Sequence, residues 1–505
     1  MYQNLRMLIW GLMTLSLFSC NSLYDGDFEL EDTERTFAVP IAFGSLNIQD
    51  VIDRAEGDAS IRIDGLGRIT ALYSGEILRD NASKIFPPVP GIFEFAIFDT
   101  IAELPLPVNG SYRIDKGIFD NTNIYFKFNH SEKEVIKVRM FIESVNNDGI
   151  VWEKDYTLDF TNDADGVIET SSSSLLNWVA FPVNNKIKFR YLAYKPNGDR
   201  IKMSYAAMRF DVLKFTYLDG YFGNHTFDIK GDIIKINLFD LWKSGGLEIE
   251  QPQITLDVDN AFGFPVRSKV NQLTVKTVGD KLFNVESEYI NKGIDFDYPS
   301  INQVGQTKNT VFHFNAQNSN IGELFKDKVI QVIYDFDALA NPDGDTGVKN
   351  FYTSDGFFSV KVNVELPMKI KANLFTIADT IDLDLSDYDA AKAVELKIKT
   401  ANSFPMDMVV GLIFLDNNNN VLYTLAESEK IKVGSAPLNG GEKTTTKNTQ
   451  EHVLNLDVDK FSSIKQAKKI LVTGSFDTNI QSATPIWLYN DYGMDITIGA
   501  IVKIQ

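Results

Sequence analysis

An internal repeat constrains the fold of this chain more than any other feature of its sequence. Residues 256–265 read LDVDNAFGFP, and residues 396–405 read LKIKTANSFP. In each segment an alternating apolar and polar run, which is typical of a half-buried strand, leads to an Asn and then to Phe-Pro. The two segments start 140 residues apart. The pattern therefore predicts two copies of one strand-rich unit.

Flanking elements keep nearly the same spacing, which strengthens the prediction of a repeat. In the first copy we predict a strand at 310–314, a short helix at 321–326 and strands at 329–337 and 352–364. In the second copy we predict a strand at 452–458, a helix at 461–468 and strands at 470–477 and 489–502. A third, fainter copy comes earlier: a strand at 124–129 also ends in Asn, and strands at 135–145 and 150–158 flank an Asn-Asp-Gly hairpin signal.

These repeats predict an all-β chain with few short helices, arranged as tandem antiparallel β-sandwich-like units of the usual sandwich size. The predicted divisions are a lipoprotein signal peptide at 1–20, an acidic tether at 21–36, an N-terminal β segment at 37–120, and sandwich-like units at 121–225, 226–366 and 367–505.

The strand-Asn-Phe-Pro pattern resembles the β-sandwich domains of water-stress and late-embryogenesis-abundant proteins, whose strands carry a similar Asn-Pro-Phe-like turn. The likeness covers about twenty residues in each of the last two units and implies a fold without indicating a ligand. In physical terms, Asn tolerates the left-handed backbone region and Pro ends the strand. We expect this motif to have a structural role.

The N-terminus has the features of a signal peptide that ends in a lipid-attachment site. Arg6 precedes an apolar run at 7–17, which is too short to span a bilayer, and Leu17-Phe18-Ser19-Cys20 follows. These four residues resemble the lipobox of bacterial lipoproteins, which implies that Cys20 is acylated and becomes the new N-terminus. The alternative is an ordinary leader that happens to end in Cys.

Six acidic residues lie between Asp25 and Glu34. This stretch reads as a solvated tether and resembles the export signal of Bacteroidota surface lipoproteins. The resemblance implies a lipid-anchored outer-membrane protein at the cell surface, with a periplasm-facing lipoprotein as the alternative.

Composition excludes several classes of function. The chain has 505 residues, 44% of them hydrophobic and 12% aromatic, which is enough for packed cores, and its formal charge of −19 makes nucleic acid an unfavourable partner. Cys20 is its only cysteine. Disulfides, cysteine nucleophiles and cysteine-based metal sites are therefore not expected in the folded part.

No His-Glu-x-x-His run, Gly-x-Ser-x-Gly elbow or P-loop occurs in the sequence. His313 and His452 lie 139 residues apart, so we expect them at equivalent packing positions in two copies. The candidates for a calcium site are four acids near one turn, with a polar surface turn as the alternative: Asp335, Asp337, Asp343 and Asp345. No other cofactor and no catalytic residue is predicted.

These observations lead to a functional hypothesis without an enzyme activity. We expect a membrane-anchored envelope protein with a non-catalytic role in binding, adhesion or assembly, and an outer-membrane protein complex is its candidate partner. The first alternative is a surface lipoprotein that captures polysaccharide for an importer, with exposed aromatic rings stacking on sugars. A glycoside hydrolase that uses two carboxylates, or a sandwich that encloses an apolar ligand, are the remaining alternatives.

Overall fold

The computed structural model describes residues 35–48, 59–75, 78–85, 89–90, 94–108, 111–228, 231–237, 242–383, 393–440, 442–478 and 484–504. The predicted leader, Cys20 and nearly all of the predicted tether lie outside these residues. Within the described part, no helix is both long enough and apolar enough to pass through a bilayer.

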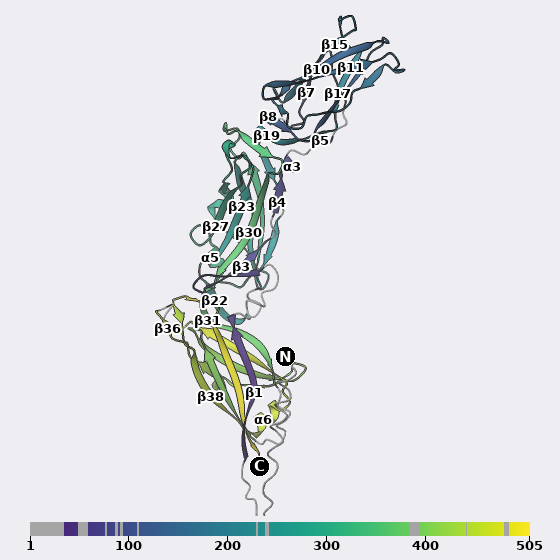
Figure 1. Ribbon diagram of the computed structural model, residues 1–505. Coiled ribbons are helices and arrows are strands. Elements are labelled where there is room, and N and C mark those ends of the chain that lie inside the picture. Colours follow the sequence, from purple (N-terminus) through teal and green to yellow (C-terminus); the bar gives the residue numbers. More distant parts are fainter. Residues whose placement is uncertain are drawn as a thin grey trace, which may run out of the picture.

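The protein is all-β, as predicted, and consists of three β-sandwiches that follow one another in a row (Figure 1). We call them the distal, middle and basal units. All strand pairs in them are antiparallel, and each sandwich contains two main sheets. Rings from facing sheets meet in the cores: Phe128 lies 5.9 Å from Tyr191 in the distal unit, and Phe227 lies 6.1 Å from Phe358 in the middle unit.

The distal unit contains strands β5 to β19. They are β5 (Val89–Pro90), β6 (Phe95–Ala96), β7 (Ile101–Pro105), β8 (Arg113–Phe119), β9 (Asn123–Asn129), β10 (Val135–Asn147), β11 (Ile150–Asp159), β12 (Val167–Glu169), β13 (Ser173–Ser174), β14 (Val179–Ala180), β15 (Lys186–Tyr194), β16 (Arg200–Ile201), β17 (Tyr205–Phe210), β18 (Val212–Leu213) and β19 (Phe215–Tyr221).

The middle unit combines an early segment of the chain with a later one. Its elements are β2 (Ala59–Ile63), β3 (Ile69–Ser74), β4 (Leu78–Asn81), α3 (Ala82–Ile85), β20 (His225–Phe227), β21 (Asp232–Lys235), β23 (Gln253–Asn260), β24 (Val266–Thr277), β25 (Leu282–Asn284), α4 (Glu288–Lys292), β26 (Asp295–Phe296), η1 (Ile301–Gln303), β27 (Lys308–Phe314), α5 (Ile321–Leu324), β28 (Val329–Ala340), β29 (Asn350–Thr353) and β30 (Phe357–Pro367).

The basal unit contains the first and the last strand that the structure describes. Its elements are β1 (Arg35–Asn47), β22 (Trp242–Ile249), β31 (Lys369–Asp382), β32 (Ala393–Asn402), β33 (Asp407–Leu415), β34 (Val421–Thr424), η3 (Glu427–Glu429), β35 (Ile431–Val433), β36 (Leu438–Asn439), β37 (Lys443–Thr444), β38 (Asn448–Leu456), α6 (Val458–Ile464), β39 (Lys469–Asp477), β40 (Ile486–Trp487) and β41 (Gly493–Ile504).

All three units share one strand order. The first sheet runs β1-β41-β32-β38 in the basal unit, β3-β30-β23-β27 in the middle unit and β6-β17-β9-β12 in the distal unit. The second sheet runs β31-β39-β33-β34, β21-β28-β24-β25 and β7-β15-β10-β11, respectively. The strand order therefore repeats in the distal unit, where the sequence pattern is faintest.

The units are nested along the chain. The distal unit lies between β4 and β20 of the middle unit, and the middle unit lies between β1 and β31 of the basal unit. One basal strand, β22, lies between β21 and β23 of the middle unit in the sequence and pairs with β31. The stretch 37–120, predicted to be one N-terminal β segment, therefore supplies strands to all three units. Its strands pair with partners hundreds of residues away, such as β1 with β41 and β3 with β30.

Buried Asn side chains explain the strand-Asn-Phe-Pro motif. The side-chain oxygen of Asn260 accepts the N–H of Phe262 at 2.9 Å, and that of Asn402 accepts the N–H of Phe404 at 2.8 Å. Both Asn side chains are fully buried. Neither residue has a positive φ, so the motif does not use the tolerance of Asn for the left-handed region. The Asn instead closes the turn with its side chain, and the role of the motif is structural, as expected.

The prediction that His313 and His452 are equivalent is wrong. Ile398 and Leu256 are equivalent, because each lies four residues before the Asn of its motif. Ile398 pairs with His452, whereas Leu256 pairs with Phe312. His452 therefore corresponds to Phe312. A shift of one residue moves a strand side chain to the other face of its sheet, so His313 and His452 point to opposite faces.

Candidate functional site at the distal tip

The joints between units show which loops are covered and which are free. At the joint between the middle and distal units, β29 pairs with β19, so one sheet continues from unit to unit. Gly263 of the middle unit exchanges two backbone hydrogen bonds with Phe351, and the ring of Phe264 lies 6.0 Å from that of Phe222. The turn after β23 thus supports the next unit.

The joint between the basal and middle units has a comparable contact. The N–H of Asn490 donates to the carbonyl of Gly67, and the guanidinium of Arg68 lies 5.2 Å from the ring centre of Trp487 and 3.0 Å from Glu442. Phe404, in the turn after β32, packs on Tyr492 near this joint. In both lower units the turn after the central strand therefore lies at the end that faces the next unit.

In the distal unit the equivalent turn, residues 130–134, lies at the end that no other unit of the described part of the chain covers (Figure 1). We call this end the tip. The turn reads His-Ser-Glu-Lys-Glu, without the Phe and Pro of the other two copies. Because strand side chains alternate, His130 faces the same side as buried Phe126 and Phe128. Asn260 and Asn402 occupy this core-facing position at the ends of the equivalent strands.

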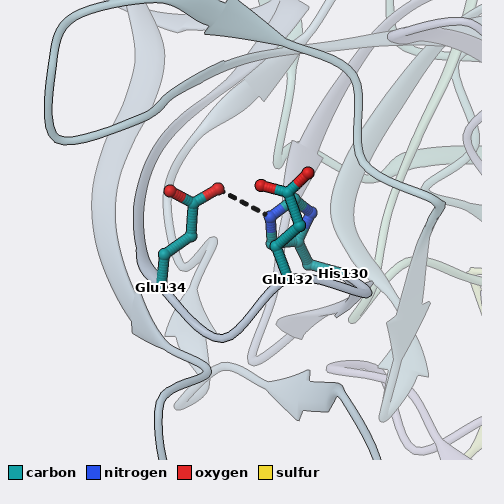
Figure 2. A group of neighbouring side chains, drawn as sticks. All are labelled: His130, Glu132 and Glu134. Carbon is teal, nitrogen blue, oxygen red and sulfur yellow. Dashed lines mark hydrogen bonds and ion pairs between the residues drawn. The ribbon is translucent and has the colours of Figure 1, made fainter.

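The turn brings together a histidine and two glutamates, which Figure 2 shows side by side. One ligand atom from each of His130, Glu132 and Glu134 lies within 4.8 Å of the others. Nε2 of His130 is 3.1 Å from Oε1 of Glu134. Lys195, which follows β15, joins the group: its Nζ is 3.0 Å from Oε1 of Glu134 and also contacts Glu132.

Neighbouring loops hold this group in place. The N–H of His130 donates to the carbonyl of Gly166 at 2.9 Å, and the N–H of Phe160 donates to the carbonyl of Glu134 at 3.1 Å. The imidazole ring lies 5.6 Å from the ring of Phe160. The imidazole is 7% exposed, whereas the side chain of Glu132 is 59% exposed, so the group runs from the core edge to the surface.

The electrostatics of the tip follow from these contacts. Hydrogen bonds from Lys195 and His130 hold the pKa of the Glu134 carboxyl below its ordinary value. Contacts with Glu132 and Glu134 raise the pKa of Lys195. At neutral pH the tip therefore carries the ionised Glu134 carboxylate beside a charged Lys195.

A strained hairpin completes the tip. In the lower units an inserted unit lies between the first strand of the first sheet and the first strand of the second sheet. In the distal unit the same connection, from β6 to β7, is only a tight turn from Phe98 to Ile101. Asp99 and Thr100 both have positive φ, 53° and 74°, which is rare for a β-branched residue. The turn presents the ring of Phe98 at 77% exposure.

Three of the four candidate calcium ligands have other partners. Asp337 accepts a hydrogen bond from Asn271 at 2.9 Å, Asp343 pairs with Arg267 and Asp345 pairs with Arg113. Asp335 lies in β28. Among the described residues, the tip holds the only group of three or more His, Cys, Asp or Glu side chains whose candidate metal-ligand atoms lie within 4.8 Å of one another.

A second polar group, which sequence reasoning missed, crosses the first sheet of the middle unit. The hydroxyl of Thr255 donates to Glu365 at 2.8 Å and lies 2.9 Å from Nδ1 of His313, and Arg62 pairs with Glu365 at 3.0 Å. Since the Thr255 proton goes to Glu365, His313 does not act as its base. The group serves as a cross-strand hydrogen-bond ladder, and only the strand register brings it together.

The tryptophans whose side chains the structure describes lie in packing positions. Trp152 is 4% exposed and lies 6.0 Å from Phe126, Trp178 packs against the core, and Trp487 lies under Arg68 at the basal joint. They are therefore not exposed stacking platforms. Exposed rings at the tip end come instead from Phe98, Tyr194 and Tyr205.

Comparisons with known proteins identify no family. No family model matches the chain, and no curated protein matches it. A crystal structure from Parabacteroides distasonis, of a protein described as a candidate secreted protein, is similar at 10% identity and a TM-score of 0.29, covering 93% of this chain and 99% of the other. The VP2 subviral particle of infectious bursal disease virus is similar at 8% identity and a TM-score of 0.15, covering 80% and 74%. These scores are too low to support a conclusion about function.

Proposed function

We propose that this protein is a lipid-anchored envelope protein with a non-catalytic role, in which the basal and middle units hold the distal unit away from an outer-membrane surface as a binding head. The nested arrangement of the three sandwiches carries this proposal. It places the first and last described strands in one unit and the tip at the opposite end (Figure 1).

The orientation of β1 supports attachment at the base. β1 begins at Arg35, opposite Ile504, and ends at Asn47, opposite Gly493. Residues 489–490, which contact the middle unit, lie close to the second end. The chain therefore enters the basal unit at the end remote from the middle unit. Fourteen residues separate Cys20 from Arg35, and a chain of that length spans at most roughly 50 Å.

The joints support a role as a spacer. A sheet that continues through β19 and β29 resists bending more than a flexible linker would. The buried side chain of Asn350 adds to this joint by accepting hydrogen bonds from the backbone of Phe222 at 3.0 Å and from Asn341 at 2.8 Å. Such a joint fixes the distal unit relative to the middle unit.

Capture of polysaccharide is the second candidate, and the exposed rings at the tip favour it. Phe98 is 77% exposed, Tyr205 39% and Tyr194 36%. Aromatic faces can stack on sugar rings, and tyrosine adds a hydroxyl for hydrogen bonding. Retardation in polysaccharide-containing gels that is lost in Phe98→Ala would support this candidate, and unchanged mobility across a broad panel of polysaccharides would remove it.

Labelling with a fatty-acid analogue tests the anchor. We expect the full-length chain to incorporate the label and to sediment with outer membranes, and Cys20→Ala to lose both properties. A wild-type chain that stays unlabelled and soluble would contradict the proposal. Protease treatment of whole cells then separates the two orientations, because only a surface-facing protein is cleaved before lysis.

Site-specific photo-crosslinking in intact envelopes tests the binding head. A crosslinking amino acid at Phe98 reports on the tip, and one at Val421, which is 62% exposed in the basal unit, serves as the control. We expect a discrete adduct from position 98 and none from position 421. Adducts from the basal position alone would mean that the distal unit is not the binding part.

A further inference from the structure

From the geometry of the tip we infer a binding site for one divalent transition-metal ion, of the Zn²⁺ class, formed by His130, Glu132 and Glu134. The three candidate ligand atoms already lie within 4.8 Å of one another. An ion bonded to each at about 2.0–2.2 Å holds its ligand atoms no more than about 4.4 Å apart, so the side chains need only a small inward movement to reach it. The inference concerns the tip alone and stands independently of lipid attachment.

The donor set selects the class of metal. One imidazole nitrogen and two carboxylates suit Zn²⁺ and neighbouring transition metals, whereas Ca²⁺ and Mg²⁺ prefer sites made of oxygen alone. Zinc sites with three protein ligands leave a fourth position open. Because the side chain of Glu132 is 59% exposed, that position is accessible to water or to a ligand group from a partner.

A comparison of the three sandwiches shows that this turn differs from its equivalents in the other two units. In the middle and basal units the core-facing end of the central strand carries Asn, whose side chain closes the turn. In the distal unit this position is His130, and its Nε2 points to Glu134 rather than to a backbone amide. Packing against Phe160 and the backbone hydrogen bond to Gly166 hold the imidazole in place, so the site is largely formed in advance.

Lys195 supplies the positive charge beside the two glutamates in the present arrangement. Its ammonium pairs with both glutamates but carries only one charge. A divalent ion would bond both carboxylates and the imidazole, and the long lysine side chain, on a surface loop after β15, could move into water. Lys195 therefore competes with the metal, and removing its charge should strengthen metal binding.

Titration of the EDTA-stripped full-length chain with ZnCl₂ by isothermal calorimetry tests the inference, with the visible absorbance of added Co²⁺ as a second readout. We expect one ion per chain and tighter binding of Zn²⁺ than of Ca²⁺. His130→Ala should weaken Zn²⁺ binding by about 100-fold, at the upper end of the effect of supporting residues on metal affinity. Lys195→Met should tighten it.

Asp165→Asn is the matched control, because Asp165 is an exposed acid in the neighbouring loop, outside the group. It should leave the affinity unchanged. Circular dichroism checks that each variant folds, and Glu132→Gln, at an exposed position, provides a second ligand variant if His130→Ala does not fold. No saturable binding of Zn²⁺, binding that survives the loss of the ligands, or a preference for Ca²⁺ would overturn the inference.

Discussion

Replacing Asn402 by Ala tests whether the buried amide organises the turn after β32. The amide oxygen accepts the N–H of Phe404 at 2.8 Å, and the amide nitrogen donates to the carbonyls of Met406 at 3.1 Å and Gly434 at 3.0 Å. The side chain is fully buried. Ala would remove all three hydrogen bonds and leave their partners without them.

The expected loss can be estimated from these bonds. A hydrogen bond contributes about 1 kcal/mol net, and a buried partner left unsatisfied costs about 1–3 kcal/mol. Three bonds therefore predict a loss of about 3 kcal/mol in the stability of the basal unit. Asn260 makes two such bonds, to Phe262 at 2.9 Å and to the carbonyl of Asp297 at 3.2 Å, so Asn260→Ala should cost the middle unit about 2 kcal/mol.

Hydrogen exchange measured by mass spectrometry is the suitable assay, because it reports each unit separately in a chain that is not expected to unfold in one step. Peptides from β33 and β39 should exchange faster in Asn402→Ala, and those from β24 and β28 should not. Asn439→Ala, at an exposed position in the same unit, is the control. A loss below 1 kcal/mol in the basal unit, or an equal loss in the control, would refute the reasoning.

Two further predictions concern the middle unit. A Cβ at Gly263 would lie 2.0 Å from the ring of Phe351, so Gly263→Ala should loosen the distal joint by about 1–3 kcal/mol and speed exchange in β29. The control Gly246→Ala should not, because a Cβ there would meet its nearest atom at an ordinary contact distance of 3.8 Å. Burial opposes ionisation of Glu365, but hydrogen bonds from Thr255 and others outweigh it and lower its pKa from 4.5. The stability that the ionised Glu365 contributes is present above pH 4.5 and is lost as the pH falls through its lower folded-state pKa. Urea denaturation at several pH values should therefore show that the stability of Glu365→Gln depends less on acid pH than that of the wild type. An unchanged pH dependence would contradict this prediction.

Much of the local structure could be predicted from the sequence. Alternating apolar residues, such as those of 124–129 and 256–260, predicted strands that the structure contains as β9 and β23. Period-two alternation is a local signal, because one face of a strand packs on the core while the other meets solvent. For the same reason the repeated Asn and Phe-Pro could be recognised as a structural motif.

The tip could have been found only in part. His130, Glu132 and Glu134 follow a predicted strand at every second position. In an extended chain this spacing places the three side chains on one side. That the turn lies at a free end, and that Lys195 reaches it from 61 residues later in the chain, depends on which units are neighbours. The calcium hypothesis illustrates the converse, since nearness in sequence did not show that Asp343 and Asp345 pair with different arginines.

The sequence by itself determined the class of secondary structure, the repeat and the turn chemistry, because these depend on residues close together along the chain. Only the tertiary structure decided the nesting of the units, the register and the composition of the tip. β1 pairs with β41 across more than four hundred residues, and backbone hydrogen bonds are the same for any pair of strands. The choice among edges of similar strands is made by the packing of whole sheets, which no local pattern records.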